Sequence, residues 1–107
     1  MVLIKVIDRP DVDYTCYLEK DYDGRVFLHN TVKRYSARVK REMLKVMEII
    51  QNQIRAPLYC IHSLHDIPEH LTKYWSVMGM EPYALELDAQ GRTSIVYRKE
   101  FMNSGEQ

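Results

Sequence analysis

A cluster of basic residues at the start of a helical pattern is the segment of this chain best suited to binding chemistry. Six cations and one acid fall between positions 33 and 45: Lys33, Arg34, Arg38, Lys40, Arg41 and Lys45, with Glu42. Exposed cations at the positive end of a helix dipole are unfavourable by on the order of a few tenths of a kcal/mol each. An anionic partner would relieve this cost, whether a phosphate group, nucleic acid or an acidic protein surface. The alternative is a solvated helix face neutralised by nearby acids.

Four histidines are the other candidates for chemistry. His29 lies in a β-rich run, and an imidazole, whose unperturbed pKa is about 6.5, suits a general base. The alternative is a structural histidine on a strand. His62, His65 and His70 follow a spacing that matches no metal-ligand pattern, because a zinc site needs nitrogens that converge at about 2.0–2.1 Å. We therefore predict no metal site and interpret these three as polar residues of loops and the surface.

The aromatic residues near the basic cluster allow a second kind of binding. Four of the eight tyrosines fall in the first third of the chain: Tyr14, Tyr17, Tyr22 and Tyr35. Aromatic rings interleaved with Arg and Lys are typical of surfaces that bind single-stranded nucleic acid or proteins. Ordinary packing of tyrosines on strands is the alternative. Cys16 would be a nucleophile only if His29 faced it from the neighbouring strand.

The composition sets limits on these possibilities. The 107 residues are 46% hydrophobic, which is enough for one domain, and 15 basic residues balance 15 acidic ones. Attraction to nucleic acid would therefore come from a local patch rather than from the net charge. No apolar run approaches the ~20 residues that cross a bilayer, and the first residues lack a signal-peptide pattern. We expect two reduced cysteines in a cytoplasmic protein.

The basic cluster opens the one long amphipathic helix that the sequence predicts. Its apolar residues recur at the spacing of one helix face: Val39, Met43, Val46, Met47, Ile50 and Ile54. Ser36 is the expected N-cap, and Pro57 limits how far the helix can continue. Methionines 43, 47, 78 and 80 are expected to fill the core.

The remaining patterns predict an α/β domain with a mixed sheet. Six strands are expected, at Val2–Asp8, Tyr14–Glu19, Arg25–Thr31, Pro57–Ser63, Pro82–Leu87 and Thr93–Lys99. A second helix is expected over Asp66–Met80, ended by Gly79. The order is therefore β-β-β-α-β-α-β-β. A strand, a helix and a buried strand in succession predict that the third and fourth strands are parallel. We expect a single domain over 1–101 and a flexible tail over 102–107.

From the third strand onward the chain resembles the second half of the GNAT (N-acetyltransferase) superfamily. Three features carry the resemblance: the strand–helix–strand of 25–63, the segment KYWSVMGM at 73–80, and the antiparallel pair at 82–99. The resemblance implies a GNAT-like mixed sheet. In that family, a glycine-rich turn at the start of the central helix holds the pyrophosphate of acyl-coenzyme A through backbone N–H groups.

This sequence departs from the family pattern in three places. The turn at 34–40 contains no glycine, so side chains hinder close approach of the backbone to a phosphate. The position of the family's proton-donating tyrosine holds Trp75, and Tyr74 lies one residue early, which turns it by about 100° on a helix. The family's two N-terminal helices are missing, because residues 8–14 are too few to form them. The chain also resembles short GNAT-like bacteriophage proteins, including internal virion proteins of podoviruses.

Three functions follow from this resemblance and these departures. The first hypothesis is a degenerate GNAT-like domain that needs no cofactor and acts as a binding or structural protein, with a protein partner or with itself, in a phage particle or in the host cytoplasm. The second is a minimal acetyl-CoA-dependent N-acyltransferase. In that case Arg34, Ser36, Arg38 and Lys40 would hold the phosphates, and His29 or Tyr74 would move protons. The third is a regulator that binds nucleic acid or another anion through the basic helix start.

Overall fold

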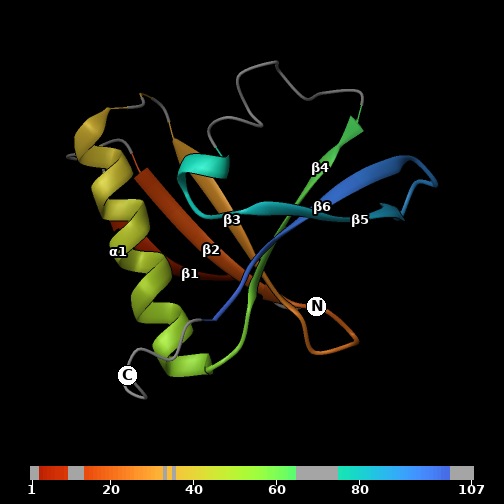
Figure 1. The fold of residues 1–107 in the computed structure, drawn as a ribbon, viewed down its shortest axis with the longest axis horizontal. Coiled ribbons are helices and arrows are strands. Elements are labelled where there is room, and N and C mark those ends of the chain that lie inside the picture. Colours follow the sequence, from red (N-terminus) through yellow and green to blue (C-terminus); the bar gives the residue numbers. More distant parts are fainter. Residues whose placement is uncertain (1–2, 10–13, 33, 35, 65–74, 102–107) are drawn as a thin grey trace.

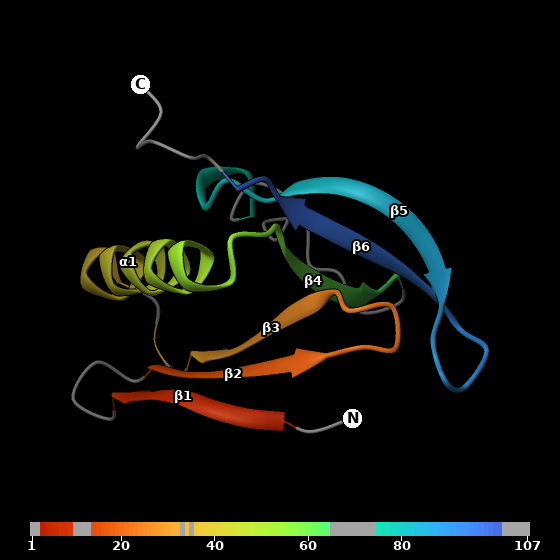
Figure 2. The ribbon, with the colours of Figure 1, turned by 90° about the horizontal axis from the view of Figure 1, so that it is seen from below.

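A six-stranded mixed sheet with a long helix packed on it forms the fold (Figure 1). The structure is a computed structural model that describes residues 3–9, 14–32, 34, 36–64 and 75–101. The strands are β1 (Leu3–Arg9), β2 (Tyr14–Lys20), β3 (Val26–Val32), β4 (Leu58–Ser63), β5 (Glu81–Leu87) and β6 (Thr93–Lys99). Their order in the sheet is β1-β2-β3-β4-β6-β5, and Figure 2 shows them following one another in this sequence.

The long helix α1 spans Ala37–Ile54 and begins where the sequence predicts. The backbone of Ser36 is extended, and its hydroxyl accepts a hydrogen bond from the Val39 N–H at 3.2 Å, as an N-cap does. At the other end Arg55 adopts a left-handed conformation with φ 53, and its N–H donates to the Gln51 carbonyl at 2.7 Å. These two caps fix the length of α1 and keep its basic first turn at the end of β3.

The six strands occur in the expected order, and each strand end lies within one residue of its predicted position. The third and fourth strands are parallel, as the strand–helix–strand pattern predicts, and all other neighbouring pairs are antiparallel. Within the described ranges no helix precedes β3, which agrees with the expected loss of the N-terminal helices.

The main core lies between α1 and one face of the sheet. Its fully buried members include the four methionines expected there, Met43, Met47, Met78 and Met80. The opposite face of the sheet carries a small separate cluster of Phe27, Tyr59 and Val96. Alternation along a strand therefore decides which face a side chain joins. This assigns the candidate site residues to two sides of the sheet.

The predicted second helix is described only over its last turn, Trp75–Val77. Gly79 ends it with φ +82. The Gly79 N–H donates to the Ser76 carbonyl at 3.0 Å, and the Met80 N–H donates to the Trp75 carbonyl at 2.8 Å. These two bonds form the expected glycine C-cap. Most of the predicted helix, like the tail at 102–107, lies outside the described residues. No helix within the described ranges is long and apolar enough to cross a membrane.

Candidate functional site

The junction between β3 and β4 has fewer paired residues than any other junction of the sheet. Only two residue pairs join the strands, Val26 with Leu58 and Phe27 with Tyr59, although β3 continues to Val32 and β4 to Ser63. Beyond these pairs the strands diverge, as Figure 1 shows. The facing backbone edges of the diverging parts are therefore not joined to each other by a ladder.

A buried thiol lies at the point where the strands separate. The Cys60 Sγ donates to the carbonyl of Leu28, the first residue of β3 beyond the paired region, at 3.4 Å. Burial raises the pKa of both cysteines, that of Cys16 to about 11. Both thiols are free, as expected. Cys16 pairs with Asn30 in the sheet, and His29 points to the opposite face, so the possibility of a Cys16 nucleophile activated by His29 is wrong.

The start of α1 brings together the four residues that the sequence predicts for anion binding. Arg34, Ser36 and Arg38 are exposed, and Lys40 is half-buried. The first turn contains no acidic residue. Ser36 uses its hydroxyl to cap Val39, while the preceding two amide groups of the helix have no acceptor within it. Positive partial charge from the helix and positive side chains thus coincide at the end of β3.

His29 is held by a carboxylate on the neighbouring strand. Its Nε2 lies 2.9 Å from Oε1 of Glu19, and both side chains are partly exposed. The pair lies on the face of the sheet opposite α1, because Leu28, the preceding residue, packs under α1. When Nε2 carries its proton toward Glu19, the Nδ1 lone pair is left to accept another proton.

His62 lies on β4, within the strand expected at Pro57–Ser63. The expectation of a loop or surface side chain is wrong, because the His62 ring packs 5.3 Å from the Trp75 ring and 6.3 Å from the Tyr97 ring. The two-residue period places it on the same face as Leu58 and Cys60. Burial lowers the pKa of His62, and the nearby His29 lowers it further. His62 and His29 lie on opposite faces of the sheet.

Asn30 adds a buried polar group that sequence reasoning missed. Its Oδ1 accepts a hydrogen bond from the Tyr14 hydroxyl at 3.0 Å, while its buried Nδ2 has no hydrogen-bond partner among the described residues. Asn30 lies on β3 beyond the last residue paired with β4. Nothing in the sequence pattern distinguishes it from a turn or surface asparagine. Asn30 is recognised as a candidate only by its buried Nδ2 without a hydrogen-bond partner, and that feature depends on the packing.

Two further residues from the sequence analysis fall elsewhere. Tyr74 lies outside the described residues, so its proposed proton transfer stays a prediction. Tyr14 is buried in the core, so it is not part of an aromatic surface for nucleic acid. Tyr22, by contrast, is 95% exposed in the turn between β2 and β3.

Two solved structures have a similar arrangement. An acetyltransferase of Bacillus subtilis in complex with CoA matches with a TM-score of 0.66 at 13% identity, over 92% of this chain and 75% of that chain. The fold is GNAT-like. An N-acetyltransferase from Staphylococcus aureus Mu50 matches with a TM-score of 0.64 at 14% identity, over 84% of this chain, which spans 61% of that protein's length. No protein-family model and no curated protein sequence matches the chain.

The GNAT-like fold places the expected groups around the diverging strands. The start of α1 offers positive charge, Asn30 offers a buried donor, and His29 offers a proton acceptor oriented by Glu19. Trp75, which stands where the family resemblance places a tyrosine, is 5% exposed and packs on His62. Indole is not a useful acid at neutral pH, so Trp75 would not serve as a proton donor.

Proposed function

We propose that this protein is a minimal acyl-CoA-dependent N-acyltransferase. The observation that carries the proposal is the end of the β3–β4 ladder after two pairs, which leaves the strands diverging toward the end of β3 that leads into a capped helix start without acid in its first turn. The diverging strands would receive the acyl end of the cofactor, and the start of α1 would receive its phosphates. The CoA complex of the Bacillus subtilis acetyltransferase, which shares this fold, supports acetyl-CoA as the cofactor to test first.

The residues at the helix start would bind a phosphate group through charged side chains, whereas a glycine-rich turn binds it through backbone N–H groups. Arg34, Arg38 and Lys40 would supply charge, and Ser36 would keep the first helical amides directed outward. Bound acetyl-CoA would supply the activated acyl group. The orphaned Nδ2 of Asn30 would donate a hydrogen bond to an oxygen that enters the space between the strands. This would satisfy a donor whose burial without a partner costs about 1–3 kcal/mol.

His29 would act as the general base toward the acceptor amine. Glu19 would fix the imidazole with Nδ1 as the acceptor, and would stabilise the imidazolium after the proton is taken. The amine would approach from the face of the sheet opposite α1, where His29 lies. Burial lowers the pKa of His62, which favours the neutral form, and its ring would line the α1 side as a polar group.

Calorimetric titration with CoA tests the phosphate site. Arg38→Glu should weaken binding by about tenfold or more, a loss of at least 1.4 kcal/mol. Lys45→Glu is the matched control, because it makes the same charge change at an exposed position further along α1. Equal affinities for the two variants would refute the role of the helix start in holding CoA.

Release of free CoA in the presence of an amine panel tests the reaction. His29→Gln should reduce turnover by about 10²-fold or more with unchanged CoA affinity. If the wild-type protein binds CoA but transfers no acyl group, the base assignment is wrong and the binding role remains. If it neither binds nor turns over, the proposed function is wrong as a whole.

A binding or structural module is the second candidate, favoured by the absence of glycine from the turn at 34–40. It predicts a stable protein complex or self-association and no affinity for CoA. An association with bacteriophage particles, and the host cytoplasm or the virion as its compartment, belong to this candidate. Binding of nucleic acid through the same basic turn would show a steep loss of affinity as salt increases.

A further inference from the structure

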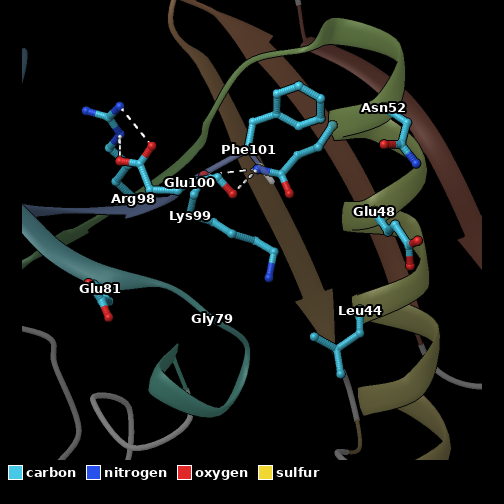
Figure 3. A pocket seen from close by; sticks show the side chains of 10 residues that line it. Leu44, Glu48, Asn52, Gly79, Glu81, Arg98, Lys99, Glu100 and Phe101 are labelled. Atoms are coloured by element: carbon cyan, nitrogen blue, oxygen red, sulfur yellow. Dashed lines mark hydrogen bonds and ion pairs between the residues drawn. The ribbon is translucent and has the colours of Figure 1, made fainter. Parts of the chain in front are cut away.

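A separate pocket of about 530 Å³ lies between the second half of α1 and the end of β6. Figure 3 shows its walls, with Leu44 and Glu48 on α1, Gly79 in the turn before β5, and Lys99 and Phe101 at the end of the described chain. None of its lining residues belongs to β3 or β4. Its size suits a small organic molecule, and its position sets it apart from the proposed acyl-CoA site.

The ammonium group of Lys99 is a polar group of this pocket that is held in place by its neighbours. Its Nζ donates to the Met78 carbonyl at 3.0 Å. A Cβ at Gly79 would lie 2.5 Å from Nζ, so the glycine makes room for the ammonium group. This is the only hydrogen bond from Nζ within the described residues, and it leaves two of the three N–H donors for a ligand. Burial lowers the pKa of Lys99 and Glu48 acts in the opposite direction.

Glu48 provides the opposite charge on the facing wall. Figure 3 shows the Lys99 side chain extending from β6 toward α1, where Glu48 lies across the pocket. Among the described residues no ion pair within 4.0 Å joins the two, so each charge remains available. Arg98 in the lining is paired with Glu100 at 2.8 Å, and Glu81 adds a second exposed carboxylate at the start of β5. The Gln51 amide is also used, because it donates to the carbonyls of Lys99 and Glu100.

We propose that this pocket binds a small zwitterion of the amino-acid class, with its carboxylate at Lys99 and its ammonium group at Glu48. The methylene groups between the two charges would lie against Leu44 and Phe101, the apolar part of the lining. A simple anion would meet the carboxylate of Glu48, and a simple cation would meet the ammonium of Lys99. Only a ligand that carries both charges satisfies both walls.

Titration with unbranched ω-amino acids tests the proposal. The probes are glycine, β-alanine, γ-aminobutyrate and ε-aminocaproate, with caproate and hexylamine as singly charged controls, followed by calorimetry and by amide chemical shifts. We expect at least one probe to bind with a dissociation constant of about 1 mM or tighter, and its singly charged controls to bind about tenfold more weakly or not at all. Equal binding of zwitterion and controls, or no binding by any probe, would overturn the proposal.

Charge variants distinguish this site from an unspecific pocket. Glu48 is exposed on α1, so Glu48→Gln should fold normally and lose about tenfold or more in affinity. Lys99→Glu alone should also lose binding, whereas the double variant E48K/K99E should regain it with the ligand reversed. Failure of the double variant to bind while its thermal unfolding matches that of the wild type would refute the two-charge geometry. CoA affinity should not change in Glu48→Gln, whatever the outcome for the proposed acyltransferase.

Discussion

The ion pair between Arg25 and Glu86 reinforces the sheet where its backbone pairing is shortest. Both terminal nitrogens of Arg25, the residue before β3, donate to the two carboxylate oxygens of Glu86 on β5, with Nη2 to Oε1 at 3.0 Å. The guanidinium also lies 5.1 Å from the Phe27 ring and 5.7 Å from the Tyr59 ring. Because β4 and β6 lie between these strands, the pair spans the junction that only two backbone pairs join.

Breaking this pair should destabilise the fold by a measurable amount. Two parallel charge-assisted hydrogen bonds exceed an ordinary surface pair, which contributes about 0–1 kcal/mol. The side chains are 24% and 32% exposed, so solvent screens them more than a fully buried pair. We expect a coupling energy of about 1–2 kcal/mol between the two residues.

A double-mutant cycle measures this energy directly. The variants are Arg25→Met, Glu86→Gln and the double mutant, each unfolded in urea at pH 7. Arg25 also pairs with Asp21 at 2.7 Å, but that loss occurs in both arms of the cycle and cancels. A coupling energy below about 0.3 kcal/mol would refute the reasoning, because the pair would then behave as an exposed one.

The pH dependence of the same variants provides an independent check. The hydrogen bonds from Arg25 hold the pKa of Glu86 below its ordinary value of 4.5. A carboxyl group whose pKa is lower in the folded than in the unfolded protein stabilises the fold fully above the unfolded pKa. This contribution is lost as the pH falls through the folded pKa. The stability difference between wild type and Glu86→Gln should therefore shrink as the pH falls below 4.5.

Three other variants or probes follow from the local geometry. Ser36→Asp should retain the N-cap and add a favourable negative charge at the helix start. Unfolding in urea should therefore show equal or greater stability, while the affinity for CoA falls. A loss of stability would contradict the assignment of Ser36 as the cap. Gly79→Ala should lose about 1–2 kcal/mol of unfolding free energy, from its φ of +82 and from displacement of Lys99; an unchanged denaturation midpoint would contradict this. The buried thiols of Cys16 and Cys60 should react with a disulfide reagent at pH 8 only as fast as the protein opens, because burial raises the pKa of both. Rapid labelling of the native protein would count against their burial.

Much of the fold could be predicted from the sequence because its patterns are local. The apolar spacing from Val39 to Ile54 and the hydroxyl of Ser36 define α1 to within a residue. The alternation of apolar residues and the Asp-Gly turn locate the β2–β3 hairpin. The parallel pairing of β3 and β4 follows from the helix between them.

The rest depends on contacts between residues far apart in the chain. Arg25 and Glu86 are 61 residues apart, and no periodic pattern indicates that they meet. The orphaned donor of Asn30 and the packing of His62 against Trp75 depend on where two strands separate, which residue periodicity does not encode. The pocket between Glu48 and Lys99 is lined by residues of α1 and by residues at the end of β6, which are far apart in the sequence. Sequence patterns therefore predict the basic helix start, whose anion binding stays a prediction, but not the packing of the groups around it.

The short junction between β3 and β4 also has a consequence for how the chain folds. Strands β1–β3 come from residues 3–32 and strands β4–β6 from residues 58–99, so each half of the sheet is contiguous in sequence. The β2–β3 and β5–β6 hairpins need only short loop closures, whereas docking of the halves must order the whole helix between them. We expect the halves to form as two cooperative units and the junction to close last. The gap that would admit an acyl group is then also the place where partial unfolding begins.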